Sequence, residues 1–536
     1  MSVKTPNLDQ LAKDGVRFNR WYSQSSSAST RASILTGRLP IKTGILKSRY
    51  LPYKAMPSLA STGGLQLDHI TLAEVLKAKG YQTAFVGHWG MGLGRKNAFL
   101  PIHQGFDHWY GVPTLHNSYC IERTSSNSGN DTNQTNLYNY HYPDDRDEDL
   151  PTSFLIITIS FTIIFGGLVV LLIFKKINMM MFFCLAAPEL ILLYLVYFSF
   201  DLMDFVYLRN CVLYRDGKII EQPYTVNNMT LRFTRETLKI LNDYSARKSP
   251  FFIMQSYLNM HEPLYVSNAF SNCTENDLFL CSLLELDWSI GKIIRTLDSL
   301  GKENNTLVIL TSTGGPCVEV HGECSRENGQ RFTESELYKE FRSGGNNVWE
   351  GDIRVPTIMR WKQELQPGQI INVTTSCMDI LPTLMDLTYQ ISLETSELDG
   401  KSLVPLLRNS SAITQHNILY HYTDVFKPSG VTYGDYKFVF VTQTENGIPY
   451  FHDPPLVFNM EAGFGEGRPM SPEEFPNTVL SHVLSELEEH LAKRTDKGTS
   501  QFDSSFLPWL FPCANMPRCL QVNIEDDDFS ELLYNK

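Results

Sequence analysis

The stretch that decides the fold runs from residue 27 to residue 40 and reads Ser27-Ala-Ser-Thr-Arg-Ala-Ser-Ile-Leu-Thr-Gly-Arg-Leu-Pro40. It begins with small hydroxylated residues and closes with Thr-Gly-Arg. Ser27 carries a hydroxyl group, and Arg31 places a permanent positive charge four residues later. The patterns around this stretch indicate which scaffold carries these two groups.

Helical and strand patterns alternate along the chain, over residues 70–86 and again over residues 231–311. The helical patterns cover residues 70–79, 231–244 and 278–300, and each is followed by an apolar strand pattern, at residues 81–86, 251–258 and 306–311. Repeated units of this kind predict an α/β fold with a doubly wound, mostly parallel sheet covered on both faces. Ligands of such sheets bind beyond the carboxyl ends of the strands. His88, His261 and Thr313 all follow predicted strands at that edge.

The pattern changes after about residue 407, which predicts a smaller C-terminal α+β subdomain. A β-like run covers residues 436–441, a helix is expected over residues 476–493, and the tail is rich in Pro and Cys. Cys513 and Cys519 are spaced to pair in an oxidising compartment, while buried free thiols are the alternative.

Composition excludes several classes of protein. The 536 residues are 43% hydrophobic, which is typical of a globular protein with a sizeable core. The formal net charge is -12 and there is no run of Lys or Arg, so the sequence argues against nucleic-acid binding. The ten cysteines form no Cys-x-x-Cys pair, which removes zinc-site and thioredoxin-like interpretations.

Two apolar runs, residues 154–174 and 179–200, predict a transmembrane helical hairpin. Each run is about 20 residues long, the length that crosses a hydrocarbon core. The lysine pair at 175–176 marks the turn as cytoplasmic, which leaves the rest of the chain on the other side. A buried hairpin in a soluble core is the alternative. Seven glycosylation sequons favour a lumenal or extracellular body and a glycoprotein: Asn130, Asn133, Asn228, Asn272, Asn304, Asn372 and Asn409.

The opening stretch resembles the active-site signature of the sulfatase family, Cys-x-Pro-Ser-Arg followed by four residues and Thr-Gly-Arg. Further segments are similar to landmarks of that family in the same order: Thr5-Pro-Asn-Leu-Asp, Gly87-His-Trp-Gly, Trp349-Glu-Gly-Asp-Ile-Arg, Met378-Asp-Ile-Leu-Pro and His452-Asp-Pro-Pro. The hairpin resembles that of the membrane subgroup with steroid sulfatase and related arylsulfatases. The resemblance implies an alkaline-phosphatase-like body in the lumen of the endoplasmic reticulum, anchored to its membrane.

The resemblance also implies the site residues. Ser27 stands where the family has the Cys that is oxidised to formylglycine, the sulfate-attacking group. Arg31 matches the signature arginine. His88 and Gly90 stand where a Lys and a His contact sulfate, and His261 matches the histidine that protonates the leaving oxygen. Ser27, Arg31, His88 and His261 are therefore the expected catalytic positions.

Calcium is the family's cofactor, and the sequence predicts that it is not bound here. Thr313 and Gly314 stand where relatives have an Asp followed by Asn or Gln, and the family's Asp-Asp pair would lie upstream of Thr5. The family also has a lysine that contacts sulfate at the position that aligns with about Gly345. This sequence has no lysine there. A hard cation needs several such oxygen ligands.

We therefore expect a membrane-anchored protein that is a sulfuric ester hydrolase by ancestry, with impaired or absent turnover. The alternative is an active arylsulfatase for aryl or steroid sulfates with a truncated N-terminus. The expected partners are the bilayer, through residues 154–200, and a hydrophobic sulfated small molecule. The expected parts are a first sulfatase segment (1–150) without its N-terminal strand, the hairpin (151–205), a second sulfatase segment (206–407) and the C-terminal subdomain (408–536).

Overall fold

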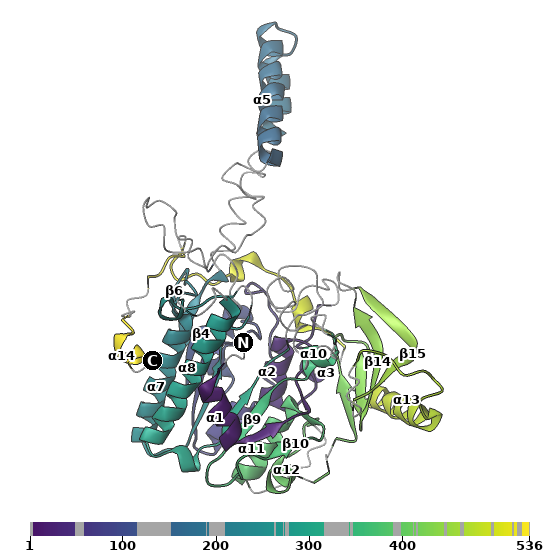
Figure 1. Ribbon diagram of the computed structural model, residues 1–536. Helices are drawn as coiled ribbons and strands as arrows, with labels where there is room; N and C mark the ends of the chain where they lie inside the picture. Colours follow the sequence, from purple (N-terminus) through teal and green to yellow (C-terminus); the bar gives the residue numbers. More distant parts are fainter. Residues whose placement is uncertain are drawn as a thin grey trace. The chain divides into compact units, whose positions relative to one another are not determined.

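The chain folds into two compact units, residues 1–121 with 211–536 (the body) and residues 122–210 (the insert). The computed structural model, drawn in Figure 1, describes residues 4–48, 58–114, 120, 152–188, 190–191, 210–261, 264–271, 273, 278–315, 342, 347–389, 398–410, 412–413, 416–443, 448–460, 466–494, 498–516, 519–522 and 528–534. Gly345 and the sequons at Asn130, Asn133 and Asn272 lie outside these residues.

A five-stranded sheet forms one half of the body. Its strands, in spatial order, are β6 (Lys218–Glu221), β5 (Leu213–Arg215), β4 (His108–Val112), β3 (Gln82–His88) and β7 (Phe251–Ser256). The pairs β3–β4 and β3–β7 are parallel, with Gly87 opposite both Gly111 and Ser256. The pairs β4–β5 and β5–β6 are antiparallel.

A second sheet of four strands completes the scaffold in the order β10 (Ile370–Ile371), β1 (Val16–Phe18), β9 (Thr357–Arg360) and β8 (Val308–Thr311). Only β1–β10 is parallel in it, and a short parallel pair joins β2 (Trp21–Tyr22) to β11 (Thr375–Ser376). The strands β7 and β8 lie at the ends of their sheets and are half-buried at every residue.

The expectation of a mostly parallel sheet is only partly correct: among the described strands the parallel pairs are β3–β4, β3–β7, β1–β10 and β2–β11, and the other pairs are antiparallel. The α/β class itself is right, but the sheets are mixed. Asp216 and Gly217 join β5 to β6 with positive φ at both residues, +48° and +80°. A two-residue connection of this kind can only produce antiparallel neighbours. The predicted pattern of alternating helices and strands did not include this turn.

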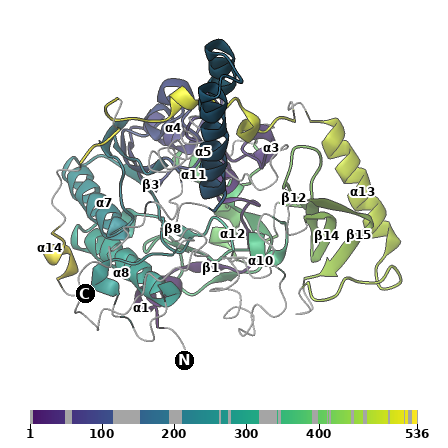
Figure 2. The same ribbon diagram turned by 90° about the horizontal axis from the view of Figure 1, so that it is seen from above.

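Helices cover both faces of the five-stranded sheet (Figures 1 and 2). On β3, Ala84 and Val86 share a buried core with Phe233 of α7 (Met229–Ala246). The intervening Phe85 belongs to a second core with Leu76 of α4 (Leu72–Ala78). Because successive residues of a strand point to opposite faces, this alternation confirms the two-sided cover.

The remaining helices of the body complete these layers. The long α8 (Leu278–Ser299) places Asp287 at the start of α1 (Pro6–Asp14), where its Oδ1 accepts the backbone N–H of Leu8 at 2.8 Å. A carboxylate at this position accepts a hydrogen bond from an otherwise unpaired amide, and its negative charge interacts favourably with the positive end of the helix dipole. The others are α2 (Ser27–Thr36), α3 (Pro40–Thr43), α10 (Glu350–Ile353), α11 (Ile380–Tyr389), α12 (Val404–Arg408) and α14 (Ser530–Leu533).

The C-terminal region is an antiparallel meander of β12 (Ile418–His421), β13 (Gly430–Tyr433), β14 (Tyr436–Gln443) and β15 (Pro449–Asn459). The helix α13 (Asn477–Ala492) covers one face, with Val483 and Leu487 packed on Val431 and Phe438. The predicted strand at 436–441 and helix at 476–493 are therefore present.

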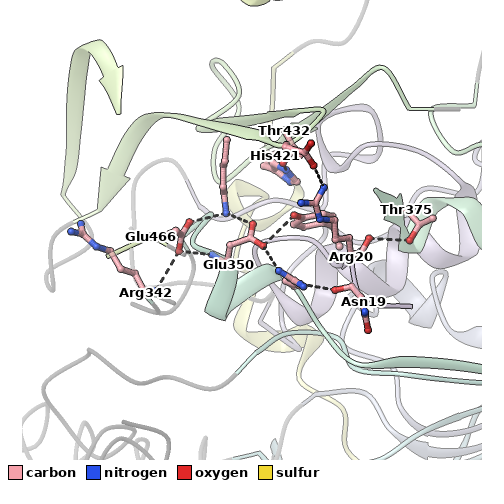
Figure 3. A network of polar contacts seen from close by, with 12 residues as sticks. Asn19, Arg20, Arg342, Glu350, Thr375, His421, Thr432 and Glu466 are labelled. Atoms are coloured by element: carbon pink, nitrogen blue, oxygen red, sulfur yellow. Dashed lines mark hydrogen bonds and ion pairs between the residues drawn. The ribbon is translucent and has the colours of Figure 1, made fainter. Parts of the chain in front are cut away.

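A buried charge network ties this meander to the rest of the body (Figure 3). Lys437 Nζ of β14 lies 2.8 Å from Glu350 Oε1 and 3.0 Å from Glu466 Oε1, and all three side chains are fully buried. The hydroxyl of Tyr22 on β2 donates to Glu350 at 3.1 Å. The neighbouring Lys437 and Arg354 keep the pKa of Glu350 low although burial opposes this, whereas burial raises the pKa of Glu466.

Three disulfides join described cysteines: Cys120–Cys211, Cys273–Cys281 and Cys513–Cys519. The last is the pair expected from the sequence. Cys377 is a buried free thiol, and burial raises its pKa to about 12.

The insert contains two helical segments joined by a short turn. The first is α5 (Thr152–Ile173) and the second covers residues 179–188, with Lys175 at φ +53° in the turn. The rings of Phe165 and Phe182 meet edge to face at 5.9 Å, so the two segments contact each other. Over the residues that the structure describes, no helix is both long enough and apolar enough to cross a membrane.

Candidate functional site

The N-terminus of α2 is the base of the candidate site. Ser26 caps the helix, and its side chain accepts the amide of Ser29 at 3.2 Å. Gly37 ends the helix at φ +63°, a conformation that favours glycine. Every residue from Ala28 to Thr36 is buried, whereas Ser27 at the first helical position is half-buried. The expected nucleophile position is thus the open end of a buried helix.

Arg31 lies one helical turn after Ser27 and is 2% exposed. Its Nε donates to the carbonyl of Trp89 at 2.8 Å. Its Nη2 is buried without a hydrogen-bond partner, and no described carboxylate pairs with the guanidinium. Burial without a compensating anion lowers its pKa from 12.5 to about 9. A buried cation in this state is a strong attractor for an anion.

His88 and Gly90 lie beside Arg31. His88 is the last residue of β3 and is 1% exposed. Gly90 has φ +71°, and a Cβ built on it would overlap Arg31 Nη2 and lie 2.7 Å from His88 Nε2. The two side chains therefore fill the space that any larger residue at position 90 would need. A histidine, which the family resemblance implies at position 90, does not fit the present arrangement.

The turn after β8 contacts α2 through Thr30, which is not one of the expected catalytic positions. Thr30 Oγ1 donates to the carbonyl of Thr313 at 2.8 Å and accepts the amide of Gln24 at 3.0 Å. Ser312 Oγ donates to the carbonyl of Gly314 at 2.7 Å. The sequence signal that could have identified Thr30 is its position in the first turn of the helix, where Ser and Thr hydroxyls commonly form hydrogen bonds with nearby backbone groups.

His261 follows β7 and is exposed. Its strand pairs with β3 up to Gly87 and Ser256, so the chain leads from the end of β7 to His261 at the same sheet edge as His88. Of the four expected positions, Ser27 and Arg31 share α2, and Arg31 and His88 meet around Gly90. The expected role of His261 as an acid stays a prediction.

The groups near Thr313 do not fit a calcium ion. The carbonyl of Thr313 accepts the hydroxyl of Thr30, and the carbonyl of Gly314 accepts that of Ser312. Within the described ranges, no cluster of three or more His, Cys, Asp or Glu side chains could hold a metal.

A family model described as "Sulfatase" matches residues 2–391, and one described as "C-terminal region of aryl-sulfatase" matches residues 414–521. Arylsulfatase H of Canis lupus familiaris is 29% identical over 99% of this chain and 94% of its own. Human steryl-sulfatase is 29% identical over 96% of this chain and 88% of its own.

Solved structures share the fold. A sulfatase from Pseudoalteromonas matches with a TM-score of 0.66 at 20% identity, covering 94% of this chain and 87% of its own. A phosphonate monoester hydrolase from Silicibacter pomeroyi matches with a TM-score of 0.52 at 16% identity, covering 92% of each chain. At these identities the likeness concerns the fold and not the activity.

Proposed function

Because this chain belongs to the sulfatase family, we propose that it binds a sulfate ester at the Ser27 and Arg31 site without catalytic turnover. The ligand we propose is a hydrophobic sulfated small molecule. Anion binding at this site and the absence of turnover have separate physical reasons.

The uncompensated charge of Arg31 is the observation that carries the proposal. Its guanidinium is buried, keeps an unused Nη2 donor and has no carboxylate partner in the described part of the chain. Burying a charge is costly unless an opposite charge and hydrogen bonds accompany it. A sulfate group supplies both, since its oxygens are anionic acceptors that a guanidinium binds well.

The start of α2 supports the same ligand. Ser27 and Arg31 are four residues apart in one helix, so both lie on the same face. The positive end of the helix dipole also favours an anion at Ser27. Beside Arg31, a protonated His88 would be a further donor to sulfate.

Turnover is not expected because serine has one hydroxyl. In the family, the formylglycine hydrate carries two, and deprotonation of the second expels the bound sulfate. If Ser27 attacked, its Oγ–sulfur bond would form, the sulfur–oxygen bond to the alcohol would break, and the serine proton would pass to the leaving alcohol. The resulting serine sulfate has no internal route of release, so the chemistry would stop after one event.

An active hydrolase is the competing function. Relatives named arylsulfatase H and steryl-sulfatase match almost the whole chain, which favours it by ancestry. It requires Ser27 to be converted to formylglycine. Intact-mass and peptide mass spectrometry of the purified chain would detect that conversion directly, and its presence would favour the hydrolase.

Binding is tested by calorimetry of the purified full chain with 4-nitrophenyl sulfate. We expect one site in the wild type and no measurable heat in Arg31→Met. The matched control is Arg17→Met, which removes an exposed arginine from β1 and should leave binding unchanged. Equal binding by wild type and Arg31→Met would contradict the proposed site.

We also propose that residues 154–200 anchor the chain in the endoplasmic reticulum membrane with the body in the lumen. The uncharged runs and the Lys175-Lys176 turn support this orientation. Disulfides and sequons are compatible with an oxidising, glycosylating compartment. Three described sequon asparagines are exposed: Asn304, Asn372 and Asn409.

A further inference from the structure

A short C-terminal stretch of the body, residues 504–522, exposes an unusual amount of apolar side chain; we call it the apolar segment. Residues 504–516 contain no charged side chain. Five large apolar side chains are between 52% and 79% exposed: Phe506, Trp509, Met516, Leu520 and Val522. Single exposed apolar residues need no explanation, but such a concentration indicates an interaction surface.

The exposure belongs to a fixed conformation. The amide of Leu507 donates to the carbonyl of Ala60 at 2.9 Å, and Gln222 and Gln521 exchange backbone hydrogen bonds of 2.9 and 2.8 Å. The side chain of Gln222 holds the intervening loop, which the disulfide at 513–519 closes. These contacts hold the segment at both ends while its apolar side chains face outward.

The apolar segment lies beside the place where the insert joins the body. Gln222 is two residues from Tyr224, whose amide donates to the carbonyl of Cys211 at 3.0 Å. Cys211 is bonded to Cys120, so this disulfide marks both connections to residues 122–210. In Figure 1 the yellow C-terminal chain runs along the edge of the body past β6, the strand that ends next to Gln222.

We infer that the apolar segment is a second membrane contact, which lies in the interface of the bilayer next to the insert. The inference rests on the proposed membrane hairpin. A bilayer that holds residues 154–200 reaches the body where the insert is connected, and there residues 504–516 of the segment offer an uncharged stretch with an exposed tryptophan. Tryptophan and large aliphatic side chains favour the boundary between headgroups and acyl chains.

Tryptophan fluorescence provides a specific test. The chain has seven tryptophans, and residues 122–210 contain none. Trp509 is 76% exposed, Trp361 is half-buried, and the other five are buried: Trp21, Trp89, Trp109, Trp288 and Trp349. The full chain is reconstituted into phosphatidylcholine vesicles with or without bromine on the acyl chains. Bromine quenches only tryptophans that reach the acyl chains.

We expect brominated lipid to lower the emission by about one seventh, since one tryptophan of seven reaches the membrane interface. Trp509→Phe should remove this quenching, and the matched variant Trp361→Phe should keep it. Flotation of the same vesicles separates the two proposals. Protein that floats but shows no quenching, or quenching that survives Trp509→Phe, overturns the membrane contact alone.

Protein that does not float overturns the hairpin and the contact together. The remaining occupant is a second copy of the chain. A second copy would be indicated by two results together: emission that brominated lipid does not quench, and a dimer in light scattering that Trp509→Ser converts to a monomer. That outcome also overturns the inference.

Discussion

Replacing Arg31 by methionine should stabilise the ligand-free protein while it abolishes sulfate binding. The burial that lowers the pKa of Arg31 from 12.5 to about 9 corresponds to a cost of about 5 kcal/mol, at about 1.4 kcal/mol per pKa unit. The variant loses the hydrogen bond from Nε to Trp89 O, which is worth about 1.5 to 3 kcal/mol. Methionine keeps most of the apolar stem, so the expected net gain is roughly 2 kcal/mol.

The assay is thermal unfolding of the full chain, dialysed free of sulfate and then titrated with it. Without sulfate, Arg31→Met should unfold a few degrees above the wild type. Saturating sulfate, at about 100 times its dissociation constant, should stabilise the wild type by about 2.7 kcal/mol and leave the variant unchanged. Arg17→Met serves as the control and should respond like the wild type. A variant that unfolds earlier, yet still gains stability from sulfate, would refute the reasoning that Arg31 is an uncompensated anion-binding charge.

Three further predictions concern the body. Burial opposes the charge of His108, but hydrogen bonds to the carboxylates of Asp216 and Glu236 raise its pKa from 6.5 to about 9. This shift corresponds to about 3 kcal/mol, which solvent screening of the partly exposed pair reduces to about 2 kcal/mol. The contribution is complete below about pH 6.5 and disappears as the pH rises through 9. Unfolding curves of wild type and His108→Gln should therefore converge above pH 9, and a constant difference would contradict this. Lys437→Met removes the cation that pairs with Glu466 and leaves Glu350 with Arg354 alone, so it should cost about 3 to 5 kcal/mol in chemical denaturation. Adding Glu350→Leu and Glu466→Leu should recover most of that loss, and no recovery would refute the pairing. Peptide N-glycosidase should reduce the mass of the protein made in secretory cells by releasing glycans from Asn304, Asn372 and Asn409. An unchanged mass would count against a lumenal body.

Much of the scaffold was predictable because its elements carry local signals. The helix at 278–300 and the strand at 306–311 appear as α8 and β8. Their apolar periodicity and the glycine at position 301 determine these bounds. Strand direction was less accessible, since it depends on connections. The Asp216-Gly217 turn reverses the chain within two residues, and the repeated helix–strand pattern elsewhere concealed that local signal.

The site was predictable in position but not in its interactions. The signature placed Ser27 and Arg31, and the strand pattern placed His88 at the end of β3. The sequence could not show that Arg31 and His88 fill the space over Gly90, because that depends on packing between α2 and the end of β3. It also could not show that the carbonyl of Trp89 holds Arg31, since every residue carries a carbonyl.

The most direct test of binding without turnover is the amount of 4-nitrophenol that the full wild-type chain releases from 4-nitrophenyl sulfate. The account predicts no more than one molecule of nitrophenol per protein molecule, because a sulfated Ser27 cannot be released. Continued release beyond several equivalents, absent in Ser27→Ala made in the same cells, would contradict it.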